Sequence, residues 1–184
     1  FTASLVGYWL TLGSELVFVG DGGATEPNDA SRRYGTEATL FWRPLPWLAF
    51  DASGGLTHTR FRGVPAGENR IPNAVSEVLS AGASIDLPNG LSASLRLRHF
   101  GAAPLIEDNS ARSQPTTLVN LGAYYRLGPA RIGLDILNLF DARDADISYY
   151  YASRLAGEPA EGVEDHHIHP VEPRQVRVSL RYSF

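Results

Sequence analysis

The last eleven residues of the chain, "RQVRVSLRYSF" at positions 174–184, alternate apolar and polar side chains. The apolar series is Val176, Val178, Leu180, Tyr182 and Phe184. Because successive side chains of a strand point to opposite faces, this period of two predicts a β-strand with one apolar and one polar face. The ends of soluble domains are usually polar and poorly ordered. An apolar series that runs to the last residue therefore needs a surface to cover it.

The same alternation recurs along the whole chain. Helical periodicity is scarce, and 18 glycines and 12 prolines are scattered throughout. We expect an all-β, antiparallel protein, with strands near 1–12, 14–20, 33–43, 46–62, 76–87, 90–100, 115–127, 130–138 and 174–184. Most of these stretches reach the nine to eleven residues, roughly, that a tilted strand needs to cross a membrane.

The composition excludes several classes of protein. A net charge of −4 gives no basic surface for nucleic acid. The absence of cysteine excludes disulfides and thiolate metal sites. We find no nucleophile elbow and no phosphate-binding loop, so we expect neither enzyme activity nor a cofactor. The chain lacks methionine and begins with Phe1 inside a strand-like stretch, so we expect a piece of a longer protein.

Short and long connections alternate between the expected strands. The short ones are "LGSE", "RPLPW", "LPNGL" and "LGPAR", which have tight-turn compositions. The long ones include "DGGATEPNDAS", "RGVPAGENRIPNAV", "GAAPLIEDNSARSQ" and the run from about 139 to 173. Outer-membrane barrels have this asymmetry, with short periplasmic turns and long extracellular loops. A soluble β-sandwich that buries its apolar faces is the alternative.

Aromatic residues near the strand ends favour the barrel. We assign to an interfacial girdle Tyr8, Trp9, Trp42, Trp47, Phe100, Tyr125, Tyr182 and Phe184. Charged side chains in the strand centres would then line a polar interior, namely Asp51, Arg96, Arg98, Arg126, Arg131, Arg177 and Arg181.

Four segments of the chain resemble TonB-dependent outer-membrane receptors. "NLFD" at 138–141 is similar to the close of that family's penultimate strand, and "EPR" at 172–174 to the entry of its last strand. The terminal strand, with Tyr182 and Phe184, resembles the signal that the barrel-assembly machinery reads. Upstream, "ELVFVGDGGATEPNDASRRYGTEATLFWRPLPWLAFDAS" resembles a strand, loop and strand of these receptors.

The resemblance implies a fold, a location and partners. Residues 1–184 would be about nine strands of a 22-stranded transmembrane barrel, whose plug domain and N-terminal strands lie outside this chain. The protein would sit in the outer membrane of a Gram-negative bacterium, in contact with outer-membrane lipid. It would take up a scarce nutrient, such as a ferric siderophore or another metal chelate, with energy from the TonB complex through the plug. A passive porin-type or adhesin-like barrel is the alternative.

Three loop clusters are candidates for the ligand site. The aromatic cluster is Tyr149, Tyr150 and Tyr151 with Arg154, which could stack on a flat chelate or belong to the interfacial girdle. The acidic cluster is Glu107 and Asp108, which could bind a cation or belong to an ordinary acidic loop.

The third cluster is the run "EDHHIHP", whose histidines are His166, His167 and His169. Imidazoles and carboxylates suit transition metals, so this run could be a metal site. The alternative is a solvated loop whose geometry no strand fixes.

Overall fold

The computed structural model describes residues 1–19 and 24–184, and in these residues the chain is all-β. Gly20, expected to end a strand, and positions 21–23 of the "DGGATEPNDAS" loop lie outside the described residues. The strands are β1 (Thr2–Leu12), β2 (Glu15–Val19), β3 (Ala24–Asn28), β4 (Ser31–Leu45), β5 (Leu48–Phe61), β6 (Glu77–Asp86), β7 (Leu91–Phe100), β8 (Thr116–Leu127), β9 (Ala130–Leu137), β10 (Ala145–Ser153), β11 (Val163–Pro170) and β12 (Gln175–Tyr182). In the same residues, no helix has the length and apolar character needed to cross a membrane.

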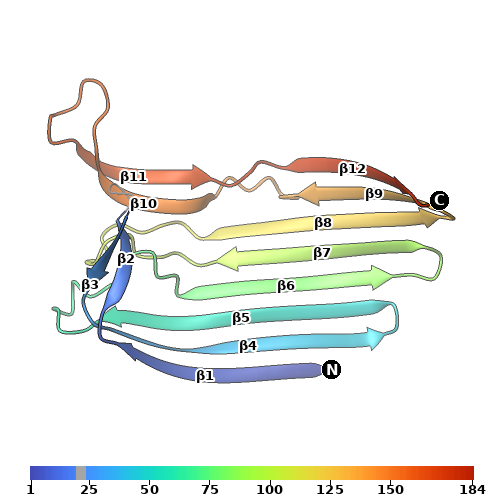
Figure 1. The fold of residues 1–184 in the computed structure, drawn as a ribbon, viewed down its shortest axis with the longest axis horizontal. Coiled ribbons are helices and arrows are strands. Elements are labelled where there is room, and N and C mark those ends of the chain that lie inside the picture. The colour runs from blue at the N-terminus through green and yellow to red at the C-terminus, as the bar shows by residue number, and fades with distance from the viewer. Residues whose placement is uncertain (20–23) are drawn as a thin grey trace.

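Eight of the described strands form one antiparallel sheet, which we call the main sheet. Its order is β1-β4-β5-β6-β7-β8-β9-β12. Figure 1 shows the main sheet as a single open layer, with the first and last strands at its two edges. This is the expected antiparallel arrangement, a segment of a barrel wall that does not close on itself.

Among the described residues the main sheet has eight strands, where about nine were expected. The stretch predicted at 14–20 does form a strand, β2, but it pairs with β3 in a separate hairpin. "LGSE" is therefore not a turn between barrel strands, because it leads into this hairpin. The short apolar run of β2 carries no signal that separates a spanning strand from a loop strand. Glu15 is buried and forms an ion pair with Arg33 of β4, which holds the hairpin to the sheet.

Short turns and long loops lie at opposite ends of the main sheet. The β4–β5, β6–β7 and β8–β9 turns share one end, which we call the short-turn rim. The long connections share the other end, the long-loop rim, together with the β2–β3 and β10–β11 hairpins. Both chain termini lie at the short-turn rim (Figure 1).

The strand register gives the main sheet one apolar and one polar face. Val176, Val178 and Leu180 of β12 lie opposite Ile136, Leu134 and Ile132 of β9, which defines the apolar face. The polar face carries the side chains between them and includes the expected interior arginines Arg96, Arg98, Arg126, Arg131, Arg177 and Arg181. The expected alternation is therefore continuous across strands.

The apolar face is uncovered, which separates a barrel wall from a sandwich. Val178 is 77 % exposed and Leu180 is 74 % exposed. A soluble protein rarely leaves so large an apolar surface in contact with water. The few buried apolar side chains gather in and near the long loops instead, and they include Phe61, Ile71, Ala103, Leu105 and Ala111. Within the described residues no second sheet packs on the apolar face, so the β-sandwich alternative is wrong.

The register also tests the aromatic girdle. Trp42 stacks on Phe50 at 5.6 Å on the apolar face, and Tyr125 and Tyr182 share that face near the short-turn rim. Tyr8 and Phe100 do not belong to the girdle, because both lie on the polar face. The Tyr8 hydroxyl is 2.5 Å from that of Thr57, and Arg98 lies over the ring of Phe100 at 5.4 Å. An aromatic residue near a strand end reaches the membrane interface only when its position in the period of two faces outward.

Candidate functional site

A hollow of about 490 Å³ opens at the long-loop rim, where β7 and β8 meet the base of β10. Arg98 and Phe100 line it from the polar face of β7, and Asp146 and Tyr149 line it from β10. The Arg98 guanidinium lies 3.7 Å from the Asp146 carboxylate. Both side chains are about half exposed, so the pair keeps hydrogen-bonding capacity for a further group. We call this hollow the rim pocket.

The β10–β11 hairpin rises beside the rim pocket and joins two of the predicted clusters. Tyr149 pairs with His167 in the strand register, and Tyr150 pairs with His166. The Tyr151 and His167 rings stack at 3.8 Å with 10° between their planes. The Tyr150 and His166 rings meet edge to face at 5.1 Å.

The expectation that no strand fixes the histidines is wrong, because all three lie in β11. Their run alternates poorly, so the sequence alone gave a weak strand signal, and pairing with the tyrosine strand stabilises it. Because neighbouring residues of a strand face opposite ways, His166 lies on one face of the hairpin, and His167 and His169 lie on the other. In the part of the chain that the structure describes, no group of three or more His, Cys, Asp or Glu side chains is placed to hold a metal ion.

The acidic cluster lies at the tip of a compact loop. Asp108 accepts a hydrogen bond from the backbone amide of Ser110 at 2.9 Å. Hydrogen bonds from Ser110 hold the pKa of the exposed Asp108 carboxyl below its usual value. The backbone carbonyl of Glu107 accepts from the Arg70 amide at 3.0 Å, which links this loop to the preceding one. Neither Glu107 nor Asp108 lines the rim pocket.

Arg154 also lies apart from the rim pocket. Its Nε donates to the backbone carbonyl of Glu158 at 3.2 Å, within the tip of the hairpin. The Glu158 carboxylate in turn accepts from the Leu155 amide at 2.6 Å. The structure therefore brings Tyr149 to the pocket, keeps Tyr150 and Tyr151 on the hairpin beside it, and leaves Arg154 at the tip.

One contact connects the histidine strand to the acidic loop. His166 Nε2 lies 3.3 Å from the backbone carbonyl of Arg112. Arg112 itself is held by Asn109 and by the carbonyl of Ala102 at 3.0 Å. This contact ties β11 to the loop that carries Glu107 and Asp108, although 54 positions separate His166 from Arg112.

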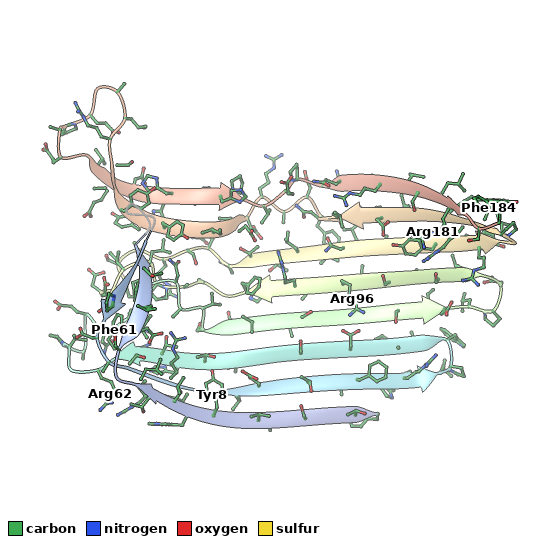
Figure 2. The ribbon with its side chains drawn as sticks, viewed as in Figure 1. Tyr8, Phe61, Arg62, Arg96, Arg181 and Phe184 are labelled. Atoms are coloured by element: carbon green, nitrogen blue, oxygen red, sulfur yellow. The ribbon has the colours of Figure 1, made fainter. Side chains whose placement is uncertain are left out.

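The polar face below the rim pocket is a hydrogen-bonded wall. Arg96 of β7 reaches across Gly82 of β6 to Asp51 of β5, with 2.5 Å between nitrogen and oxygen. Tyr124 of β8 bonds to Asp135 of β9, and the Arg131 guanidinium lies 4.2 Å from the centre of its ring. Figure 2 shows Arg96 in the middle of the sheet and Arg181 near the short-turn rim.

Sequence reasoning missed the pairing of Arg98 with Asp146. The sequence predicts only that Arg98 lines a polar interior, and Asp146 belongs to no predicted cluster. No local signal reveals this pair, because 48 positions separate its members. Phe100 was assigned to the girdle from its position near a strand end, and its place in the rim pocket follows from the register alone.

Solved structures share this architecture. The ferric yersiniabactin uptake receptor FyuA from Yersinia pestis matches 99 % of this chain with a TM-score of 0.61 and 16 % identity. The siderophore receptor PiuA from Acinetobacter baumannii matches 98 % with a TM-score of 0.70 and 13 % identity.

The fold is that of a TonB-dependent receptor barrel. The ferric-catecholate import receptor Fiu from E. coli K12 gives the same result, with 99 % of this chain matched, a TM-score of 0.68 and 15 % identity. The chain spans 35 % of FyuA, 26 % of PiuA and 25 % of Fiu, so it corresponds to about a quarter to a third of such a receptor. No protein-family model and no curated protein sequence matches the chain.

Proposed function

We propose that residues 1–184 form the C-terminal part of a TonB-dependent receptor barrel that imports a metal chelate, most simply a ferric siderophore. The plug domain and the N-terminal strands lie outside this chain. The observation that carries the proposal is the open eight-stranded wall with its polar face, its short-turn rim and its elaborated long-loop rim. The fold shared with FyuA, PiuA and Fiu supports it.

The rim pocket and the hairpin suit a flat, anionic ligand. Stacked aromatic and imidazole rings offer faces to a conjugated chelate, as Tyr151 and His167 do to each other. Arg98 supplies a cation beside the pocket, where a charge-assisted hydrogen bond to a ligand carboxylate or phenolate is stronger than a neutral one. Tyr149 and Arg98 are therefore the residues that we assign to ligand contact, with Tyr150 and Tyr151 on the adjoining hairpin.

The polar face suits a lumen through which an anionic substrate passes. Its arginines would give the lumen a positive field that attracts anionic substrates and polar plug groups. The apolar face would lie against outer-membrane lipid, with the short turns in the periplasm and the long loops outside. The terminal strand would present Tyr182 and Phe184 to the barrel-assembly machinery.

Uptake by intact cells tests the proposal. A strain that lacks the full-length protein should fail to accumulate a labelled ferric siderophore under iron limitation, and the wild-type gene should restore accumulation. Restored accumulation should stop when the TonB complex is deleted. Accumulation that persists without TonB would overturn active import and favour a passive porin-type barrel.

Two variants connect the uptake to the rim pocket. We expect Arg98→Ala and Tyr149→Ala each to lower the affinity for the chelate by about tenfold, which is the loss of one good charged or stacking contact. Arg177→Ala, on the polar face of β12 and outside the pocket, is the matched control. Equal affinities in all three variants would remove the rim pocket from ligand binding.

A further inference from the structure

The apolar face changes character in three steps along β1, β4 and β5. Nearest the middle of the sheet are small and aliphatic side chains. An aromatic row follows, in which Trp9, Tyr34 and His58 lie side by side in the register. Beyond it, at the long-loop rim, Arg32 of β4 lies directly opposite Arg60 of β5.

The aromatic row is a continuous stack. The rings of Trp9 and Tyr34 lie 5.1 Å apart with 14° between their planes, and those of Tyr34 and His58 lie 4.8 Å apart with 26°. The Arg32 guanidinium lies 5.2 Å from the centre of the Trp9 ring. Tryptophan and tyrosine concentrate at the depth of lipid headgroups because one part of each ring is apolar and the other polar.

The arginines beyond this row form a cationic cluster. Like charges directly opposite each other on a sheet destabilise it. Arg70 comes close enough from the β5–β6 loop to interact electrostatically with Arg60 and His58. Arg62 joins Arg32 and Arg60 around a hollow of about 400 Å³, and Figure 2 shows Arg62 at the long-loop rim.

Within the residues that the structure describes, the cluster has no carboxylate partner. In the described part of the chain, no ion pair involves Arg32, Arg60, Arg62 or Arg70. The described lining of the hollow likewise includes no aspartate or glutamate. A group of guanidinium ions held together without a carboxylate fits a phosphate, whose oxygens accept several N–H donors at once.

A second hollow lies next to the aromatic row, on the side toward the middle of the sheet. It measures about 500 Å³, and on the apolar face Ala38, Ala52 and Gly54 lie between Leu40, Leu56 and Leu79. Thr36, Glu77 and His99 line it as well, and the last two lie 3.8 Å apart, which makes them an ion pair when His99 is protonated. Side chains this small leave a furrow between the leucines. We call it the apolar furrow.

The spacing of the two hollows matches one lipid molecule. Ala38 and Arg32 are six residues apart on β4, which is about 20 Å at the rise of a strand. A strand tilted by about 45° converts this into roughly 14 Å of depth, close to half of a hydrocarbon core of about 30 Å.

We propose that Arg32, Arg60, Arg62 and the apolar furrow bind a phosphorylated lipid of the outer leaflet, with its phosphate in the arginine cluster and one acyl chain in the furrow. The aromatic row separates the two parts at the depth of the lipid's backbone. The proposal requires that the apolar face meets lipid, and it is independent of which substrate the barrel carries.

Retention of labelled lipid by the immobilised full-length protein in neutral detergent tests the proposal. The probe is phosphatidic acid, with diacylglycerol and inorganic phosphate as comparisons. We expect phosphatidic acid to be retained at least tenfold more than either comparison, because only it engages both hollows. Equal retention of phosphatidic acid and diacylglycerol would overturn the headgroup site.

Matched variants test each half of the site. Arg32→Gln with Arg60→Gln should lower retention of phosphatidic acid about tenfold or more. Arg177→Gln with Arg181→Gln makes the same charge change on the polar face and should leave retention unchanged. Ala38→Leu fills the furrow and should also lower retention, whereas Ala123→Leu adds the same atoms to the apolar face outside the furrow.

Two results would contradict the proposal. If the arginine variant loses phosphatidic acid and inorganic phosphate alike while Ala38→Leu retains the lipid, the cluster is a site for a soluble anion. If the arginine variants fail to fold, the salt dependence of phosphatidic acid retention by the wild-type protein still tests the charged contact. Retention should fall as salt rises from about 0.1 M to about 1 M, because the Debye length shrinks from about 10 Å to about 3 Å. Unchanged retention would exclude the charged contact.

Discussion

The side-chain amide of Asn138 donates a hydrogen bond to the backbone carbonyl of Glu172, with 3.0 Å between nitrogen and oxygen. The same nitrogen donates to the carbonyl of Ala142 at 2.9 Å, and the side-chain oxygen accepts from the Ala142 amide at 2.8 Å. Asn138 is 4 % exposed and has a φ of 50°, a left-handed conformation that asparagine tolerates better than most residues. One side chain thus fastens the end of β9 to the segment that enters β12.

Replacing Asn138 should therefore loosen the last strand. Asn138→Ala removes three hydrogen bonds, at about 1 kcal/mol each, so we expect the free energy of unfolding to fall by about 3 kcal/mol. Asn138→Gly removes the same bonds but relieves the positive φ, and should be slightly less damaging. The urea midpoint of the full-length protein, followed by heat-modifiable gel mobility, measures both. A wild-type midpoint in both variants would mean that the hydrogen bonds carry no net stability.

Gly82 should be essential to the ion pair on the polar face. A Cβ built on Gly82 would lie 2.2 Å from the Arg96 guanidinium and 2.8 Å from the Asp51 carboxylate. We expect Gly82→Val to displace Arg96 and to destabilise the full-length barrel by about 1–3 kcal/mol, the usual range for overpacking. Gly7→Val is the control, because no atom lies within 4 Å of a Cβ there. Equal unfolding midpoints for the two variants would contradict this role.

We expect Phe184 to contribute to assembly of the barrel in the membrane rather than to packing within the folded protein. It is fully exposed, and its ring centre lies 6.2 Å from that of Tyr182. Figure 2 shows it at the short-turn rim, beyond the end of β12. We expect deletion of Phe184 to lower the amount of full-length protein in the outer membrane several-fold. Phe140→Ala, at another exposed phenylalanine, is the control. Wild-type levels after the deletion would exclude Phe184 as an assembly signal.

The three histidines of β11 should not act together on one metal ion. His166 faces away from His167 and His169, so we expect His166→Ala to leave the Zn²⁺ affinity of the full-length protein unchanged. If the face that carries His167 and His169 binds Zn²⁺, His167→Ala and His169→Ala should lower the Zn²⁺ affinity equally. Calorimetric titration measures all three, and a loss in His166→Ala would mean that the strand rearranges around the ion.

Much of the fold could be predicted because barrel strands are two-faced. The period of two in "RQVRVSLRYSF" reflects the surroundings of each side chain directly, so seven other strands of the main sheet were found in the same way. The stretch 14–20 shows where this fails. Its alternation is real, but a strand in a loop hairpin and a strand in the barrel wall have the same local pattern. Only pairing with β3 distinguishes them.

The candidate site was harder to predict, because it depends on contacts between distant segments. Composition alone identifies the tyrosines and the histidines as clusters, but nothing in the sequence predicts that Tyr151 stacks on His167. Arg98 and Asp146 lie on different elements, and no local rule pairs them. Phe100 and Tyr8 were misplaced for the same reason, since a position near a strand end does not say which face it occupies.

The sequence by itself determined that this chain is a set of two-faced strands joined alternately by short turns and long loops. That information is local, because it follows from the solvent that each side chain meets and from the residues that tight turns require. Only the tertiary structure decided which strands form the wall and which form hairpins, and which arginines of the described residues form no ion pair. Those outcomes depend on register, and register is set by hydrogen bonds between strands that are remote in sequence.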